Sequence, residues 1–181
     1  MSRIAVPTRD DAPAAAPPTL DAVYKQLGVV PNLFRLASLS PATLTGLTGL
    51  GAALAKTLDV KTRERIALAV AEVNGCTYCL SAHSYLAANL AKISPDEIAL
   101  ARAGRSNDSK ADAAVRFAVK VAETRGHVTD ADLEAVRVGG FTDAQIVEIV
   151  AIVVENFFTN FLNEVAQTDI DFPVIALSTA A

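Results

Sequence analysis

Two runs decide how this chain folds: Arg63-Glu64-Arg65-Ile66-Ala67-Leu68-Ala69-Val70-Ala71 and, shortly after it, Asn74-Gly75-Cys76-Thr77-Tyr78-Cys79. The first run lies in a segment that predicts a helix over residues 61–73, and Gly75 is a residue type on which helices end. The second run opens another helix, predicted over 77–90. It holds both cysteines of the chain, and His83, one of only two histidines, follows four residues later. This turn therefore gathers most of the residues that indicate chemistry.

The rest of the chain predicts further helices on either side of this pair. Start signals are clear at three places: Ser40 precedes a proline, and Ser94 and Thr142 begin capping boxes. No run alternates apolar and polar residues with period two, so we expect an all-α fold, a helical bundle without a sheet. The other helices are expected at 20–27, 32–37, 41–57, just after 94, 109–125, from 129 to the glycines at 139 and 140, and 142–166.

Length and composition fit one domain with a short appendage. The 181 residues are 51% hydrophobic, which is enough for a sizeable core. Residues 1–19 are rich in Ala and Pro without periodicity, so we expect an extended N-terminal arm before one all-helical domain over residues 20–178. The last helix is apolar on nearly every side, and a chain of this size offers few layers to cover it. We therefore expect a homo-oligomer, from a dimer to a hexamer.

Charge and hydropathy argue against several partners. The net charge is −4 and lysine and arginine form no block, which argues against nucleic acid and anionic membranes. The uncharged stretches 36–55 and 73–91 contain proline, glycines or polar side chains, so neither predicts a membrane span. The first residues lack the apolar segment of a secretory signal. We expect a soluble, cytoplasmic protein.

The Cys-x-x-Cys motif formed by Cys76 and Cys79 indicates redox chemistry. Such a pair can cycle between dithiol and disulfide, and a reducing compartment disfavours a permanent staple. At a helix start, unpaired N–H groups and the helix dipole stabilise a thiolate. Cys79 and His83 share a face with Leu86 and Leu90, so the thiols should point inward. Two alternatives stay open: core cysteines with a buried histidine, or a zinc or iron site of Cys76, Cys79, His83 and a carboxylate.

Glu64 is the other residue that spacing singles out. It shares a helical face with Leu68 and Ala71, and packing of the helices 61–73 and 77–90 can bring it near His83. A carboxylate against an imidazole holds its tautomer and raises its basicity. A solvated charge among neighbouring basic residues is equally compatible with the spacing. The second histidine, His127, follows a glycine at a helix end and is assigned no role.

The order Glu64, Cys76-Thr77-Tyr78-Cys79, His83 resembles the AhpD-like alkylhydroperoxidase branch of the carboxymuconolactone decarboxylase superfamily. Two flanking runs look like the "peroxidase-related" members of that family. These runs are Leu27-Gly28-Val29-Val30-Pro31-Asn32-Leu33-Phe34 and Asn156-Phe157-Phe158-Thr159-Asn160. The resemblance covers roughly residues 20–173.

The resemblance implies an all-helical oligomer, from dimer to hexamer, with a peroxidase activity that needs no metal, haem or other cofactor. It also implies roles for four residues. Cys79, the second cysteine, attacks the peroxide and Cys76 resolves the product, while Glu64 and His83 relay protons. The implied partners are a hydroperoxide substrate and an external dithiol reductant. One position departs from the family pattern, because well-studied members carry a histidine where this chain has Tyr78, which is neutral at physiological pH.

The predicted function is therefore a thiol-dependent (alkyl hydro)peroxidase or disulfide reductase in antioxidant defence. A second hypothesis is a decarboxylase or lactone-handling enzyme like the family's namesake. Those members do not rely on a cysteine pair, so Cys76 and Cys79 argue against it. A third hypothesis is a non-catalytic redox-sensing protein, because a redox-active pair can regulate as well as catalyse.

Overall fold

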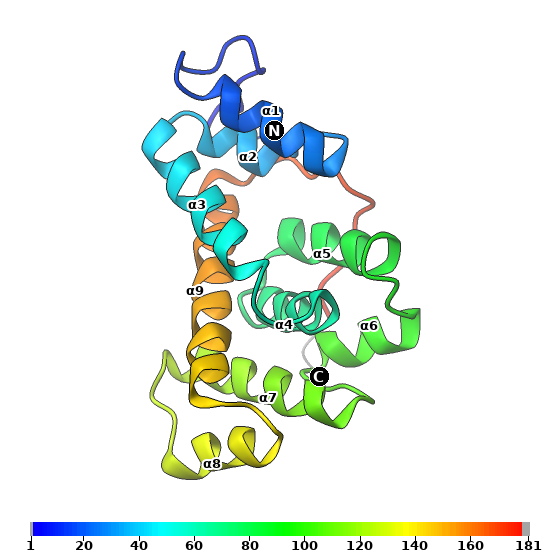
Figure 1. Cartoon of the computed structure of the whole chain (residues 1–181). Helices are drawn as coiled ribbons and strands as arrows, with labels where there is room; N and C mark the ends of the chain where they lie inside the picture. Colours follow the sequence, from blue (N-terminus) through cyan, green and yellow to red (C-terminus); the bar gives the residue numbers. More distant parts are fainter. Residues whose placement is uncertain (1, 179–181) are drawn as a thin grey trace.

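A computed structural model describes residues 2–178 as a bundle of helices (Figure 1). Within this range nine segments are α-helical and none is a strand, which confirms the all-α fold. The helices are α1 (Pro17–Leu27), α2 (Asn32–Ala37), α3 (Pro41–Leu54), α4 (Val60–Val73), α5 (Thr77–Asn89), α6 (Pro95–Arg102), α7 (Ser109–Thr124), α8 (Asp130–Val138) and α9 (Asp143–Ala166).

Side-chain caps start the helices that position the core. Ser40 accepts a hydrogen bond from the N–H of Thr43 at the start of α3, as the sequence predicts. The capping box expected at Thr142 is complete, because Gln145 returns a hydrogen bond to the backbone of Thr142. These caps fix where α3 and α9 begin along the chain.

The capping box expected at Ser94 is only half formed, and this corrects the sequence-based prediction. Ser94 Oγ accepts the N–H of Glu97 at 3.4 Å. The carboxylate of Glu97 does not return to Ser94. It binds Nε of Arg65 on α4 at 2.8 Å and also accepts from Ser106 Oγ and the N–H of Asn107. Leaving the buried guanidinium of Arg65 without a counter-charge would cost more free energy than losing the second hydrogen bond of a capping box. The carboxylate of Glu97 therefore faces α4.

Helix α1 begins at Pro17, three residues earlier than the periodicity predicts. A proline fits the first helical turn, because an N–H there has no partner within the helix. Ala16 and Leu20 are fully buried in the cluster formed with α2 and α3. Before α1, the N–H of Arg3 donates to the carbonyl of Ala166 at the end of α9, at 2.6 Å. The N-terminal residues therefore reach back to the far end of the longest helix.

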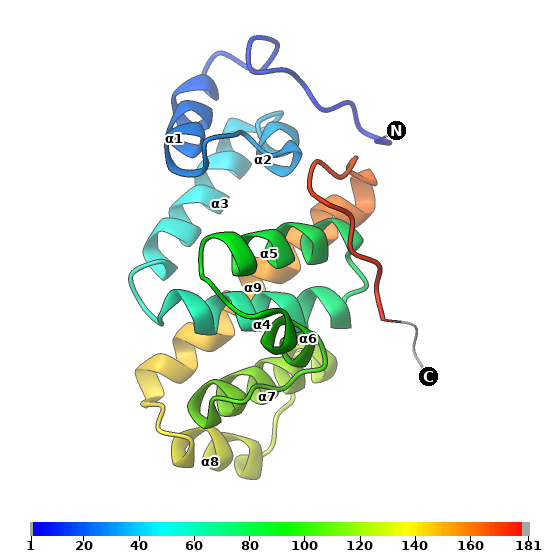
Figure 2. The same ribbon diagram turned by 90° about the vertical axis from the view of Figure 1, so that its right-hand side faces the viewer.

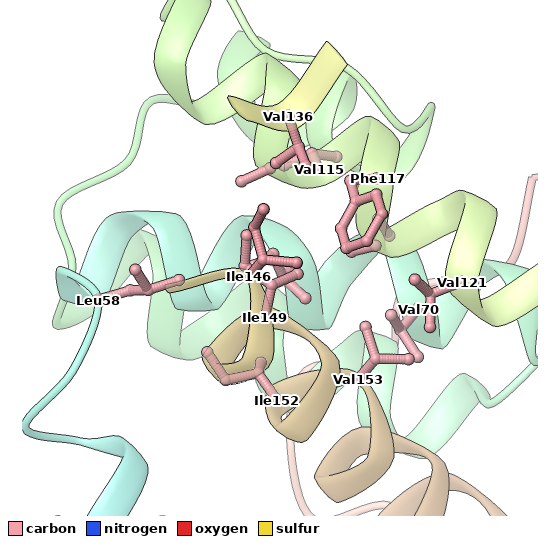
Figure 3. Packing of buried hydrophobic residues seen from close by; sticks show 14 of the residues in the cluster. Leu58, Val70, Val115, Phe117, Val121, Val136, Ile146, Ile149, Ile152 and Val153 are labelled. Carbon is pink, nitrogen blue, oxygen red and sulfur yellow. The ribbon is translucent and has the colours of Figure 1, made fainter. Parts of the chain in front are cut away.

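Helix α4 lies at the centre, with α5, α6, α7 and α9 packed against it (Figure 2). Its residues 66–71 are all buried, and the three alanines among them let neighbouring helices approach closely. One apolar cluster joins α4, α7, α8 and α9 around Val70, Phe117 and Ile149 (Figure 3). A second joins α4, α5 and α6 around Leu68 and Leu80. Together these clusters hold the α4–α5 turn against α9.

Helix α9 is buried on one side and apolar on the other. By length and composition it is the one helix within residues 2–178 that could cross a membrane. It packs against α3, α4, α5 and α7, so part of its apolar surface is buried within the chain. Its outer side carries exposed apolar side chains about one turn apart, which we call the outer stripe. The outer stripe is formed by Val147, Val150, Val154, Phe158, Phe161 and Val165.

We propose that the outer stripe binds a second copy of the chain, because an uncovered apolar surface of this length favours association. Val154→Glu places a charge at its centre and should shift the protein to a smaller species in light scattering at micromolar concentration. Val138→Glu, at an exposed valine of α8, is the matched control and should leave the mass unchanged. A parent protein that scatters as a monomer would contradict the proposal.

Candidate active site

The turn between α4 and α5 fixes both cysteines through backbone hydrogen bonds. Gly75 has φ of 68°, a left-handed conformation that favours glycine, and its N–H donates to Glu72 O at 3.1 Å. The N–H of Cys76 donates to Ala71 O at 2.9 Å. These two bonds form the pattern that closes many helix C-termini. Cys76 is then the N-cap of α5, where its Sγ accepts the N–H of Cys79 at 3.4 Å.

Both thiols are free and buried, so the expectation that they point inward is confirmed. Cys76 is fully buried and only 2% of Cys79 is exposed. The buried face of α5 does not continue along the whole helix, however. Leu90, which spacing placed on the same face, lies beyond the last helical turn and is mostly exposed. Burial is therefore concentrated on the first half of α5, where the thiols lie.

Glu64 and His83 are in direct contact. Oε2 of Glu64 lies 2.9 Å from Nδ1 of His83, and their side chains are only 16% and 24% exposed. The alternative of a solvated glutamate is therefore wrong. Burial lowers the pKa of His83, but the adjacent Glu64 carboxylate outweighs it and raises the pKa above its ordinary value. The contact with Glu64 thus favours the imidazolium form of His83 more than in an isolated histidine.

The environment of Cys79 favours a thiolate. Its pKa is lowered to about 6, chiefly by a hydrogen bond with the thiol of Cys76, while burial acts in the opposite direction. The positive charge of His83, the hydrogen bond from Asn163 and the nearby amide of Asn160 lower the pKa further. The hydrogen bond with Cys79, together with burial, raises the pKa of Cys76. The first cysteine is therefore a thiol that supports the ionised second cysteine.

Two asparagines of α9 touch this site, and the sequence did not connect them with the cysteines. Nδ2 of Asn163 donates to Sγ of Cys79 at 3.3 Å. One turn earlier, Oδ1 of Asn160 accepts from Nδ2 of Asn74, which caps the end of α4, at 2.8 Å. Asn156, Asn160 and Asn163 lie on one stripe of α9, and this spacing alone is equally compatible with contacts across an interface or to loops. Asn163 instead binds the thiol inside the chain.

Glu155 of α9 is a second carboxylate that spacing did not identify. It is half-buried, and burial raises its pKa. The charges of His83 and Arg63 oppose this rise and that of Glu64 adds to it, so Glu155 belongs to the same electrostatic group. A side chain at Gly51 of α3 would lie 2.8 Å from Oε1 of Glu155. The absence of a side chain at Gly51 thus provides the space that the carboxylate of Glu155 occupies.

Tyr78, which replaces the family's histidine, is anchored away from the proton-relay groups. Its hydroxyl donates to Oδ1 of Asp171 at 2.8 Å and accepts the N–H of Leu33 at 3.1 Å. Burial raises its pKa far above the ordinary range, so the phenol stays neutral. Phe172 packs edge-on against the same ring. Tyr78 therefore joins the cysteine motif to α2 and to the segment after α9.

That segment, residues 168–178, runs across α5 and the end of α4 (red in Figure 2). The N–H of Ile175 donates to Ser81 Oγ at 3.0 Å, and Arg102 donates to the carbonyl of Ala176 at 2.8 Å. Its apolar side chains pack on the cluster that contains both cysteines. This segment covers one side of the site, so the partly exposed His83 and Glu64 mark the other side as the route to solvent.

Two surface hollows of the protein do not reach the thiols. One of about 390 Å³ is lined by Asp59, Lys61 and Arg65 among others, and one of about 370 Å³ lies between α7 and α8. In residues 2–178 no three His, Cys, Asp or Glu side chains are grouped as ligands for a metal ion. Cys79 is thus a buried sulfur that neither of these hollows reaches.

Comparison with known proteins relates this chain to a family. Residues 41–124, which include α4, α5 and the cysteine motif, match the model of the carboxymuconolactone decarboxylase family. The matched residues make up just under half of the chain, and they support a relationship to the AhpD-like part of that superfamily, which contains enzymes. No curated protein matches the chain significantly.

Solved structures share the fold over nearly the whole chain. An alkylhydroperoxidase AhpD core, a peroxidase-related protein from Ralstonia eutropha JMP134, superposes with a TM-score of 0.83 and is 26% identical, over 94% of this chain and 92% of that one. A peroxidase-related protein from Silicibacter sp. TM1040 gives 0.79 at 24% identity, over 93% and 91%. A variant of the debrominase Bmp8 in complex with 2,3,4-tribromopyrrole gives 0.79 at 21% identity, over 94% of each chain.

The thiolate should be visible in a pH titration. With its pKa lowered to about 6, Cys79 is ionised at neutral pH and becomes protonated as the pH falls through 6. The thiolate absorbance in the ultraviolet should therefore decline below neutral pH, and Cys79→Ser should abolish that step. Glu64→Gln removes the charge that sustains the His83 imidazolium and should move the step to higher pH. A first ionisation near the ordinary cysteine value of about 8.5 would contradict this assignment.

Tyr78→Phe tests whether the hydroxyl anchors or transfers protons. Loss of its two hydrogen bonds should lower the free energy of unfolding by about 1 kcal/mol. The titration of Cys79 should stay unchanged, because the hydroxyl does not contact either sulfur in the structure. Chemical denaturation and the ultraviolet titration measure the two effects. An unchanged stability with a shifted titration would instead give Tyr78 a role in the proton relay.

Proposed function

We propose that this protein is a cysteine-based peroxidase that reduces hydroperoxides at the expense of an external dithiol, in antioxidant defence. The observation that carries the proposal is the buried Cys79, whose pKa is lowered to about 6 beside a second thiol and a His83–Glu64 ion pair. A thiolate is the nucleophile that peroxide reduction requires, and a nearby imidazolium is a proton donor for the leaving group. The relationship to an AhpD-like family supports the same chemistry.

The first step oxidises Cys79. The thiolate attacks the terminal oxygen of ROOH, a sulfur–oxygen bond forms and the oxygen–oxygen bond breaks. The sulfur loses two electrons to the peroxide, which leaves as RO⁻. The His83 imidazolium supplies the proton that converts RO⁻ to ROH, and Glu64 stabilises that imidazolium beforehand. Cys79 becomes a sulfenic acid, which keeps the hydroxyl hydrogen of the peroxide.

The second step closes the disulfide. The sulfur of Cys76 attacks the sulfur of the Cys79 sulfenic acid, and the hydroxyl leaves as water with the proton of the Cys76 thiol. The raised pKa of Cys76 keeps that proton available until this point. An external dithiol then reduces the disulfide by exchange and leaves as its own disulfide. We propose that this cycle operates in the cytoplasm, where dithiol reductants are maintained.

The alternatives have weaker support. A decarboxylase or lactone-handling function would not explain why the pKa of Cys79 is lowered. The likeness to the debrominase is one of fold alone, at 21% identity. A redox sensor would use the same pair, but would not require the His83–Glu64 pair beside the attacking sulfur. Sustained peroxide turnover separates a catalyst from a sensor, since a sensor is oxidised once.

The test is hydroperoxide consumption with dithiothreitol or a dihydrolipoyl compound as the reductant. Cys79→Ser should abolish consumption, and Glu64→Gln should reduce it by roughly 10²–10⁴-fold, the usual scale of acid–base assistance. Glu123→Gln, at an exposed glutamate of α7, is the matched control. Full turnover by Glu64→Gln would remove Glu64 from the proton relay. A parent protein that does not turn over any hydroperoxide with either dithiol would contradict the proposed function.

A further inference from the structure

The amides of Asn160 and Asn163 are arranged around Cys79 in a way that the proton relay does not explain. Both lie on the inner face of α9, one turn apart, and their exposures are 0% and 2%. Nδ2 of Asn163 donates to Sγ of Cys79 at 3.3 Å. Both amides lower the pKa of Cys79, so both act on the same sulfur. One amide from a distant part of the chain thus binds the reactive atom, and a second amide one turn away influences its pKa.

Each of these amides keeps one buried polar atom unpaired. Nδ2 of Asn160 and Oδ1 of Asn163 have no hydrogen-bond partner in the structure, although both are inaccessible to solvent. Buried polar groups are normally hydrogen-bonded, and leaving one unpaired is unfavourable. One orphaned donor and one orphaned acceptor therefore belong to residues that act on the same sulfur. This combination points to a small group with both a donor and an acceptor.

The orientation of Asn160 is set from outside the site. Its Oδ1 accepts from Nδ2 of Asn74, at 2.8 Å, so the donor end of the Asn160 amide is the end left for the interior. Asn163 is oriented by the sulfur, which takes its donor end and leaves its acceptor end free. The neighbouring Asn156 differs, because its Nδ2 donates to Ile152 O of its own helix at 2.9 Å. Among the buried asparagines of α9, only the two at the thiol have a buried side-chain atom without a partner.

We propose that Asn160 and Asn163 form an amide cradle, which holds the Cys79 thiolate and then the hydroxyl of its sulfenic acid. In the thiolate, the sulfur accepts from Nδ2 of Asn163, while Nδ2 of Asn160 is a second donor that remains unpaired. After the oxygen–oxygen bond of ROOH has broken, the transferred oxygen stays on the sulfur with its hydrogen. That oxygen can accept from Nδ2 of Asn160 while its hydrogen is donated to Oδ1 of Asn163. The proposed binding of the thiolate is independent of the proposed function. The proposed binding of the sulfenic acid rests on it.

The cradle gives Asn163 a catalytic role, since it touches the reacting sulfur, and predicts two consequences. Loss of a hydrogen bond to a charged group should raise the pKa of Cys79 by about one to two pH units. A sulfenic acid without its amide partners should also be less protected from further oxidation. Both effects should be larger at Asn163 and Asn160 than at any other buried asparagine of α9.

The experiment uses the full chain with Cys76→Ser, so that Cys79 titrates alone and its sulfenic acid cannot be resolved. Asn163→Leu and Asn160→Leu keep a similar side-chain volume and remove the amides, and Asn156→Leu is the matched control. The first readout is the thiolate absorbance as a function of pH. The second is the fraction of Cys79 trapped by dimedone after one equivalent of hydrogen peroxide, against the over-oxidised fraction by mass spectrometry. Asn163→Ala replaces Asn163→Leu if the latter does not fold.

We expect Asn163→Leu to raise the titration midpoint by about one to two pH units, Asn160→Leu to raise it as well, and Asn156→Leu to leave it unchanged. The dimedone-trapped fraction should fall in the first two variants alone. A midpoint in Asn163→Leu equal to that of the parent overturns the cradle. A shifted midpoint with an unchanged trapped fraction overturns the proposed binding of the sulfenic acid. If the midpoint shifts but the unmodified protein consumes no peroxide, the role of the amides in stabilising the thiolate is supported. That result counts against the proposed function instead.

Discussion

The structure around the α4–α5 turn depends on one constraint: a thiolate that is almost fully buried must be stabilised by protein groups instead of water. At Cys79 these groups are the N-terminus of α5, the Cys76 thiol, the His83–Glu64 pair and the Asn163 amide. None of them would be sufficient alone, because transferring a charge into a low-dielectric interior is strongly unfavourable. Their convergence requires α4, α5 and α9 to pack at a fixed distance, which the alanine-rich face of α4 allows.

Cys76 has two structural tasks in addition to its proposed chemical one. Its N–H closes α4, and its sulfur caps α5. Serine or asparagine would be a better cap, since sulfur is a weak acceptor. A cysteine at this position is therefore explained by chemistry more than by helix stability. Because the same residue ends one helix and begins the next, the two sulfurs are held at a spacing that rigid backbone hydrogen bonds define.

The sequence predicted the elements of the site better than its surroundings. Local signals such as Ser40, Thr142 and Gly75 set helix ends through neighbours three or four residues away, and they were confirmed. Helical spacing allowed the contact of Glu64 with His83 but was equally compatible with a solvated glutamate, and the packing of α4 against α5 decides between them. The prediction of a capping box at Ser94 was only half correct, because the carboxylate of Glu97 binds Arg65 on α4 instead of the backbone of Ser94. A local pattern could not anticipate that competition.

The residues that spacing missed all reach the site from far along the chain. Asn163 meets Cys79 across 84 residues, and Asp171 meets Tyr78 across 93. Such contacts are decided by how α9 crosses the α4–α5 pair, which depends on the packing of every helix between them. Amphipathic spacing shows that α9 has a polar position at each of its asparagines. It does not show which partner lies opposite, so the amides could be noticed but not assigned.

Mass spectrometry of the intact protein, before and after one equivalent of hydroperoxide, tests the central claim most directly. If Cys79 is oxidised and Cys76 resolves it, each chain should lose two hydrogens, and peptide mapping should find Cys76 joined to Cys79. Dithiothreitol should restore the original mass. A product that carries added oxygen on Cys79 with Cys76 still free, or no change in mass at all, would contradict the account.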